Sequence, residues 1–330
     1  MIGRLLGWIE PFVLVLLGTL VVASIFPPRG AWVPIVGGLA DAGIVLLFFL
    51  HGAKLSRQAI WEGARNWQLH LATLAVTFLL FPLLGLGFRA LPFVPNEFAI
   101  GLLFLSLLPS TVQSSIAFTA VARGNVAAAV CAASFSNLLG IVITPALVSL
   151  LMGSMTGGLS WTAIEGILVQ LLLPFLAGHL LRPWIGPFVA RHKAWTARVD
   201  RGSILLVVYS AFGASVVEGL WSRVSPPSLL LLIALCLLML GIVLILTTVL
   251  GRMMGLRPQD AVVLLFCGSK KSLATGVPMA GVLFSAAQVG IVLLPVIVFH
   301  QLQLIACAFI APRLAARADT ADTNGALTAR

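Results

Sequence analysis

The sequence predicts an all-α integral membrane protein whose ten transmembrane helices form two inverted five-helix repeats. Three observations lead to this fold class. Hydrophobic residues make up 60% of the 330 residues and charged residues only 9%, too few charges to cover the surface of a soluble protein. Apolar segments of about 20 residues, the length that a bilayer requires, recur along the chain. The basic residues between these segments also alternate in a way that supports this number of spans.

The apolar segments give the predicted spans in chain order. They lie at 8–26, 33–51, 68–88, 98–121, 126–152, 161–181, 203–221, 227–250, 261–284 and 289–311. The first segment is long enough to span and lacks a small-residue cleavage pattern, so it is interpreted as a membrane helix rather than a signal peptide. Three segments lie outside the spans: an amphipathic piece expected along the interface at 54–65, the longest polar connection at 182–201, and a tail expected to be disordered at 313–330.

Lysine and arginine predict the orientation in the membrane. Of the 20 basic residues, fifteen fall on the side of the N-terminus, two lie inside a span, and the opposite side has Arg29, Arg89 and Arg223. The positive-inside rule therefore places both termini in the cytoplasm, in an inner or plasma membrane. The formal net charge of +10 does not predict nucleic-acid binding, because the chain has one Tyr and no basic stripe with interleaved aromatic residues.

The two halves of the chain carry similar interruptions. We expect residues 1–152 to form the first five-helix repeat and residues 161–312 the second, inverted because each repeat has an odd number of spans. In the fourth span Pro109 is followed by Ser110-Thr111-Val112-Gln113-Ser114-Ser115. In the ninth, Gly268-Ser269-Lys270-Lys271-Ser272 leads to Pro278. An offset of about 157 residues aligns the two motifs, and such paired broken helices predict a binding site near the membrane midplane.

The two lysines of the ninth span are the most informative residues in the chain. Each costs roughly 2.5–3.5 kcal/mol at the bilayer centre, so an ionisable pair there indicates a functional site. The alternative is that they end a helix and reach an interface, but apolar residues continue on both sides. Successive helical residues diverge by about 100°, so we expect one amine to face a substrate cavity and the other to fill a polar pocket or meet a carboxylate.

Half-helix N-termini and hydroxyl groups favour an anionic or polar solute at this crossing, whereas half-helix C-termini and unwound carbonyls suit a cation. The candidate substrate- or ion-binding residues are Ser110, Thr111, Gln113, Ser114, Ser115, Asn137, Lys270, Lys271, Ser272, Thr275, His300 and Gln301. His300 either lines the cavity or hydrogen-bonds between helices, and Asp41 either pairs with a lysine, carries a proton or makes a structural hydrogen bond. Paired metal-ligand spacing, a nucleophile elbow, a P-loop and a dinucleotide fingerprint are missing from the sequence, so we expect neither an enzyme nor a cofactor, and transport without ATP.

These motifs resemble the bile acid/sodium symporter superfamily, in its SBF-like branch. The resemblance rests on the motif from Pro109 to Ser115, on Ala122-Arg123-Gly124-Asn125, and on the motif from Gly268 to Ala280. It implies a panel domain from spans 1, 2, 6 and 7, a core domain from spans 3–5 and 8–10, and unwound fourth and ninth helices where they cross. It also implies alternating-access transport of an organic anion, with sodium as the coupling ion in characterised members.

The resemblance also predicts how this chain departs from sodium coupling. The family's sodium ligands fall at Ser114-Ser115, at Thr77 as a candidate ion or proton site, and at Ala129, Ala133, Phe266 and Lys270. Because alanine and phenylalanine side chains offer no oxygen to a hard cation, we hypothesise that Lys270 or Lys271 replaces sodium, with proton coupling or none. The alternative function is a non-transporting regulator or scaffold of ion homeostasis that keeps the fold. The partners expected are a small organic anion and the bilayer, and the oligomeric state is left open.

Overall fold

The computed structural model describes residues 11–54, 66–153 and 165–328, and in these parts of the chain every regular element is helical. Seven described helices are long and apolar enough to cross a membrane, and Leu14–Ile25 and Asn96–Leu107 are shorter apolar helices. The elements are α2 (Pro11–Ile25), α3 (Trp32–Lys54), α5 (Trp67–Ala75), η1 (Val76–Leu80), α6 (Phe81–Arg89), α7 (Asn96–Leu107), α8 (Gln113–Val121), α9 (Val126–Met152), η2 (Ile167–Leu172), α11 (Leu173–Arg191), α12 (Lys193–Val217), α13 (Leu220–Arg223), α14 (Pro226–Met253), α15 (Pro258–Gly268), α16 (Leu273–Leu283) and α17 (Ala286–Thr328).

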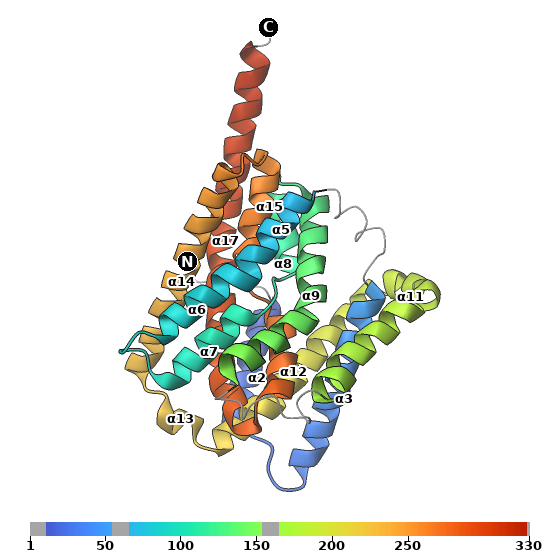
Figure 1. The fold of residues 1–330 in the computed structure, drawn as a ribbon. Coiled ribbons are helices and arrows are strands. Elements are labelled where there is room, and N and C mark those ends of the chain that lie inside the picture. Colours follow the sequence, from blue (N-terminus) through green and yellow to red (C-terminus); the bar gives the residue numbers. More distant parts are fainter. Residues whose placement is uncertain (1–10, 55–65, 154–164, 329–330) are drawn as a thin grey trace.

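The helices pack in two groups that meet along α12 (Figure 1). In the first group α3 packs against α11 and α12, and α12 packs against α2. In the second group α7 packs against α6 and α17, while α14 packs against α15 and α17. Contacts of α12 with α16 and α17 join the groups. Most of the buried apolar side chains form one continuous core that includes residues of both groups.

Two short helices, α7 and α8, replace the continuous helix that an apolar run of this length allows. Pro109 lacks an amide hydrogen and disfavours helical geometry in the preceding residue. Leu108 accordingly has φ −72° and ψ 152°, and α8 begins at Gln113. The second pair, α15 and α16, is separated by residues 269–272, and the side chain of Ser272 caps α16 by accepting from the Thr275 amide at 3.2 Å. The Ser272 amide donates to the Pro109 carbonyl at 2.8 Å, so the two interruptions touch.

Glycines let α3 and α11 approach until their backbones are in contact. A Cβ placed at Gly52 of α3 falls 2.0 Å from the carbonyl oxygen of Phe175, and one at Gly178 of α11 falls 2.0 Å from that of Phe49. Neither clash can be relieved by turning a side chain, because the opposing atoms belong to the backbone. The pair therefore fixes α3 and α11 against each other at a distance that only glycine allows.

Several sequence-based boundaries differ from the structure. The polar connection expected at 182–201 is helical, since α11 continues to Arg191 and α12 begins at Lys193. Hydropathy reports where a bilayer would end, and a helix with exposed charged side chains can continue beyond that point. The last helix, α17, extends through Thr328 and so includes most of the segment 313–330 that was expected to be a tail. The interfacial segment expected at 54–65 lies outside the described residues except for its first position.

We expect Gly178→Ala to destabilise the protein, because the added methyl group meets the Phe49 carbonyl. Overpacking of a close contact costs about 1–3 kcal/mol, and a backbone atom cannot move aside. The melting temperature of the purified protein in detergent measures the effect. Gly241→Ala in α14 is the matched control, since a Cβ there meets nothing within 4 Å. Equal melting temperatures for the two variants would contradict the backbone contact.

Candidate functional site

Lys271 lies fully inside the protein, with 1% of its surface exposed. Its Nζ donates to the carbonyl oxygens of Thr77 and Ser106 at 2.8 Å each and of Leu108 at 2.7 Å, and lies 4.1 Å from the centre of the Phe81 ring. An ammonium has three N–H donors, so main-chain oxygens satisfy all of them. Thr77 lies in the π-helical segment η1, and α7 ends beside the other two residues; both features release carbonyls from regular helical bonding.

Lys270 is equally buried but extends in a different direction. Its Nζ donates to the Ser114 carbonyl at 2.9 Å and lies over the rings of Phe118 and Phe266, 4.2 and 5.2 Å from their centres. Aromatic faces attract a desolvated cation, by about 2 kcal/mol or more where water is excluded. The partners of both lysines are thus carbonyl oxygens and rings. The carboxylate partner that the sequence analysis considered is not among them.

The carbonyl oxygens of residues 106–110 all accept hydrogen bonds from distant parts of the chain. The Lys271 amine serves residues 106 and 108, as described. The Thr144 hydroxyl donates to residue 107 at 2.8 Å, the Ser272 amide to residue 109 at 2.8 Å, and the Asn137 side chain to residue 110 at 2.6 Å. The first broken helix is therefore held open by donors that α9 and the second interruption supply. A buried carbonyl without such a donor would be costly.

The second interruption is held by a matching amide side chain. Gln303 of α17 accepts from the Lys271 amide at 2.9 Å and donates to the Lys271 carbonyl at 3.0 Å. Its Nε2 also lies 2.8 Å from Nδ1 of His300. Asn137 of α9 similarly bonds the backbone of Ser110. Each interruption is thus fixed by an amide residue of the next long helix; Asn137 was among the candidate site residues and Gln303 was not.

Two serine hydroxyls join the halves of the molecule directly. Ser110 Oγ donates to the Cys267 carbonyl at 2.6 Å, and Ser115 Oγ donates to the Phe266 carbonyl at 3.1 Å. Both serines are completely buried. These candidate residues therefore act on the backbone of α15, where their bonds stabilise the crossing rather than face an open space.

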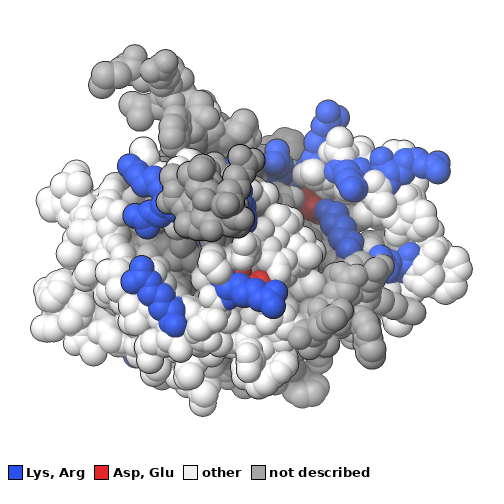
Figure 2. Space-filling model, turned by 90° about the horizontal axis from the view of Figure 1, so that it is seen from above, with Lys and Arg blue, Asp and Glu red and all other residues white. Residues whose placement is uncertain are grey.

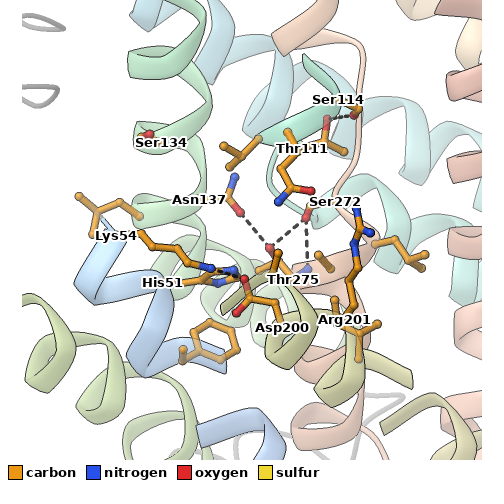
Figure 3. Close-up of a pocket in the computed structure, with 18 of the residues that line it drawn as sticks. His51, Lys54, Thr111, Ser114, Ser134, Asn137, Asp200, Arg201, Ser272 and Thr275 are labelled. Atoms are coloured by element: carbon orange, nitrogen blue, oxygen red, sulfur yellow. Dashed lines mark hydrogen bonds and ion pairs between the residues drawn. The ribbon is translucent and has the colours of Figure 1, made fainter. Parts of the chain in front are cut away.

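A cavity of about 360 Å³ lies beside the crossing (Figure 3). This volume falls in the range of sites for small organic molecules, roughly 300–1,000 Å³. Seven of the predicted site residues line it: Thr111, Gln113, Ser114, Asn137, Ser272, Thr275 and His300. Thr275 Oγ1 donates to Asn137 Oδ1 at 2.8 Å, which links α16 to α9 at the cavity wall. Neither Lys270 nor Lys271 lines this cavity, in contrast to the expectation that one amine faces it.

Four charged or ionisable side chains on the other side of the cavity were not predicted. His51 and Lys54 come from α3, and Asp200 and Arg201 come from α12 (Figure 3). Lys54 and Asp200 form an ion pair between the two helices. In the sequence these residues stand at helix ends or in the segment interpreted as a polar connection, where charged residues carry little signal. Only the packing of α3 against α12 brings them into the cavity.

Three further candidates lie away from the cavity. Asp41 is exposed on α3, so its pairing with Lys270 or Lys271 is not found. Gln301 does not line the cavity, and its buried Nε2 has no hydrogen-bond partner in the described part of the chain. Thr77 is buried, and its hydroxyl donates to the Thr73 carbonyl at 2.8 Å. Thr77 contributes to the site through its own carbonyl, which the Lys271 amine holds.

Comparison with known proteins places this architecture in a family. The model of the SBF-like CPA transporter family matches residues 10–316. The chain belongs to this family. Relatives include "Uncharacterized protein PA2026" of Pseudomonas aeruginosa, 52% identical over 94% of this chain and 95% of the relative, and "Putative symporter YfeH" of Escherichia coli K12, 48% identical over 94% of each. "Sodium/bile acid cotransporter 7" of Xenopus tropicalis is 25% identical over 81% of this chain and 80% of the relative.

Membership confirms the resemblance to the SBF-like branch of the bile acid/sodium symporter superfamily. The chain is therefore a multi-pass integral membrane protein of a transporter family, consistent with its seven long apolar helices. A transporter family also agrees with the expectation that the protein is not an enzyme.

We expect Lys271→Met to destabilise the SBF-like chain far more than Lys270→Met. Methionine keeps most of the side-chain volume but leaves three buried carbonyls without a donor, at about 1–3 kcal/mol each, whereas Lys270 serves one carbonyl. Melting temperatures in detergent measure the difference. The control is Lys193→Met, an exposed lysine at the start of α12. If Lys271→Met and Lys193→Met have the same melting temperature, the three carbonyls around the Lys271 amine do not stabilise the broken helices.

Proposed function

We propose that this protein is a secondary transporter of a small organic anion, which binds in the cavity beside the crossing of the broken helices. The observation that carries this proposal is that the N-terminal ends of α8 and α16 both border the cavity, through Gln113 and Ser114 on one side and Leu273 and Thr275 on the other. Helix N-termini carry partial positive charge and unpaired amide hydrogens, so they attract anions. Hydroxyl groups at the same place can donate further hydrogen bonds.

The names of relatives agree with this substrate class. One relative is named as a symporter and another as a sodium/bile acid cotransporter, and a bile acid is an organic anion. The apolar walls of the cavity, such as Phe12, Phe48 and Phe175, suit the hydrocarbon part of such a molecule. A ligand-sized cavity also favours a transporter over a scaffold that only keeps the fold.

The transporter proposal includes a ten-span topology. Besides the seven long helices, α2 supplies one span and the pairs α7–α8 and α15–α16 supply the interrupted fourth and ninth spans. Residues 1–152 and 161–312 are the two inverted repeats of this topology. Pseudo-symmetry is supported by the Ser110–Cys267 hydrogen bond, which joins residues 157 positions apart, the offset that aligns the two motifs. Panel and core domains correspond to the two packing groups, and their relative movement gives alternating access.

The orientation proposed for this topology follows the basic residues. The face shown in Figure 2 carries many Lys and Arg side chains and few acidic ones among the described residues. The positive-inside rule assigns such a face to the cytoplasm of an inner or plasma membrane, together with both termini. The cavity lining includes Lys54 and Arg201, so in this orientation the cavity lies toward the cytoplasmic half of the protein.

We expect binding and transport without sodium. The amine of Lys271 already fills a carbonyl cage at the crossing, and Ala129 and Ala133 are buried positions of α9 whose side chains offer no oxygen. In place of sodium coupling, transport is then coupled to protons or uncoupled. Asp41 and Thr77 are the predicted positions of an ion or a proton. Uptake into proteoliposomes measured in choline buffer tests this expectation, because a sodium-coupled carrier loses activity there. Restoration of uptake by sodium alone would contradict it.

Gln113→Glu tests the anion site with almost no change of shape. Gln113 is exposed to the cavity in the first turn of α8, where a carboxylate stabilises the helix but repels an anion. Like charges a few ångströms apart repel by on the order of 1–4 kcal/mol, so we expect anion affinity to fall at least about ten-fold. Thermal stabilisation by short-chain, medium-chain and aromatic monocarboxylates provides the measurement.

The matched control for this test is Gln288→Glu, in the first turn of α17 and outside the cavity lining. It adds the same charge at a similar helix position, so it should leave anion affinity unchanged. A monocarboxylate that stabilises wild type and Gln113→Glu equally does not bind at the proposed place. If no anion of the panel stabilises the wild-type protein, the proposal as a whole is wrong.

A further inference from the structure

One buried carboxylate oxygen of a residue that lines the cavity has no hydrogen-bond partner among the described residues. Asp200 of α12 lines the cavity and is 8% exposed. Its Oδ2 pairs with Lys54, whereas its Oδ1 is buried and makes no hydrogen bond. Leaving a buried acceptor unsatisfied costs about 1–3 kcal/mol, and more for a charged group. Most buried polar atoms in native proteins have a partner, so an exception calls for an explanation at that place.

Among the described residues, the groups around Asp200 do not provide the missing donor. From α3, Lys54 is bonded to Oδ2 and His51 lines the same cavity. Arg201, the next residue of α12, lies with its guanidinium over the Phe12 ring, 5.6 Å from its centre. Nδ1 of His300 of α17 lies 2.8 Å from Nε2 of Gln303 instead. The oxygen that lacks a partner therefore belongs to a group that borders a space large enough for a ligand.

The position of Asp200 distinguishes two parts of the cavity. In Figure 3, Asp200 and Lys54 lie on the side away from Thr111, which precedes α8, and from Ser114, in the first turn of α8. Phe48 and Ile204 are among the apolar side chains that line the cavity with them. A carboxylate repels an anion but accepts a hydrogen bond strongly. The two sides thus suit different groups of one molecule.

We propose that Asp200 Oδ1 accepts a hydrogen bond from the substrate, which makes Asp200 a residue that determines specificity. The substrate is then an organic anion whose apolar body carries a hydroxyl, amide N–H or ammonium group remote from the anionic group. This inference rests on the proposed anion site. A site built to pair a buried polar group discriminates strongly against analogues that lack the partner, because the buried group is then left unsatisfied.

Matched ligand pairs test this inference on the purified full-length protein. The pairs are phenylpropanoate with its para-hydroxyphenyl analogue, and octanoate with ω-hydroxyoctanoate, so that each pair differs by one hydroxyl group. We expect the hydroxylated member of at least one pair to bind about ten-fold more tightly, as titrated by thermal stabilisation, since one satisfied buried acceptor accounts for such a factor. In Asp200→Ala this preference disappears while binding of the unsubstituted anion persists.

Two further variants separate a loss of preference from a loss of structure. Glu218→Ala removes an exposed carboxylate at the end of the same helix, outside the cavity, and should keep the preference. The double variant Lys54→Met/Asp200→Leu removes both members of the ion pair, so no lone charge remains, and should lose the preference as Asp200→Ala does.

The outcomes of these experiments distinguish a failure of this inference from a failure of the proposed anion site on which it rests. If wild type binds both members of every pair equally, the hydrogen-bond assignment is wrong and the anion site stands. The same holds if the preference survives in both Asp200 variants. Stabilisation by no member of any pair contradicts the anion site and this inference together.

Discussion

The rest of the structure depends on how the opened backbone of residues 106–110 is satisfied inside an apolar protein. A broken helix exposes carbonyls, and a membrane interior supplies no water to bond them. Here the donors are an ammonium, a hydroxyl, a backbone amide and a side-chain amide. The most demanding of these donors is Lys271, because its charge is tolerated only while all three carbonyls surround it. Charge and broken backbone thus stabilise each other, and neither would be stable alone.

Much of this arrangement could be predicted from the sequence, because residues close together in the chain determine where each helix is interrupted. Pro109 and the Lys270-Lys271 pair violate the rules for a membrane helix so strongly that they mark an interruption without any knowledge of the fold. The hydroxyl residues beside them, such as Thr111, could be placed near the crossing for the same reason. Their neighbours along the chain determine where the helix stops, and the structure adds the partners.

What could not be predicted depends on contacts between distant helices. That carbonyls of η1 and α7 surround Lys271 could not be expected from the sequence, because any residue type can supply a backbone oxygen. The sequence also suggested a cavity-facing amine, whereas the cavity instead receives Lys54 and Asp200 from α3 and α12. These two residues lie 146 positions apart, and only the close packing of their helices reveals them as a pair. Helix ends were also misjudged where polar side chains cover a continuing helix, as between Arg182 and Arg191.

The Lys271 amine, whose three N–H groups are all hydrogen-bonded, also affects how much net charge crosses the bilayer in each transport cycle. A coupling ion that binds and leaves adds its charge to every turnover, whereas a positive group fixed to the polypeptide returns with it to the starting position. In the transport cycle proposed above, which runs without sodium, current through a membrane containing this protein would therefore report the solute's own charge and that of any co-moving proton. The lysine itself would contribute a transient displacement, not a steady flow.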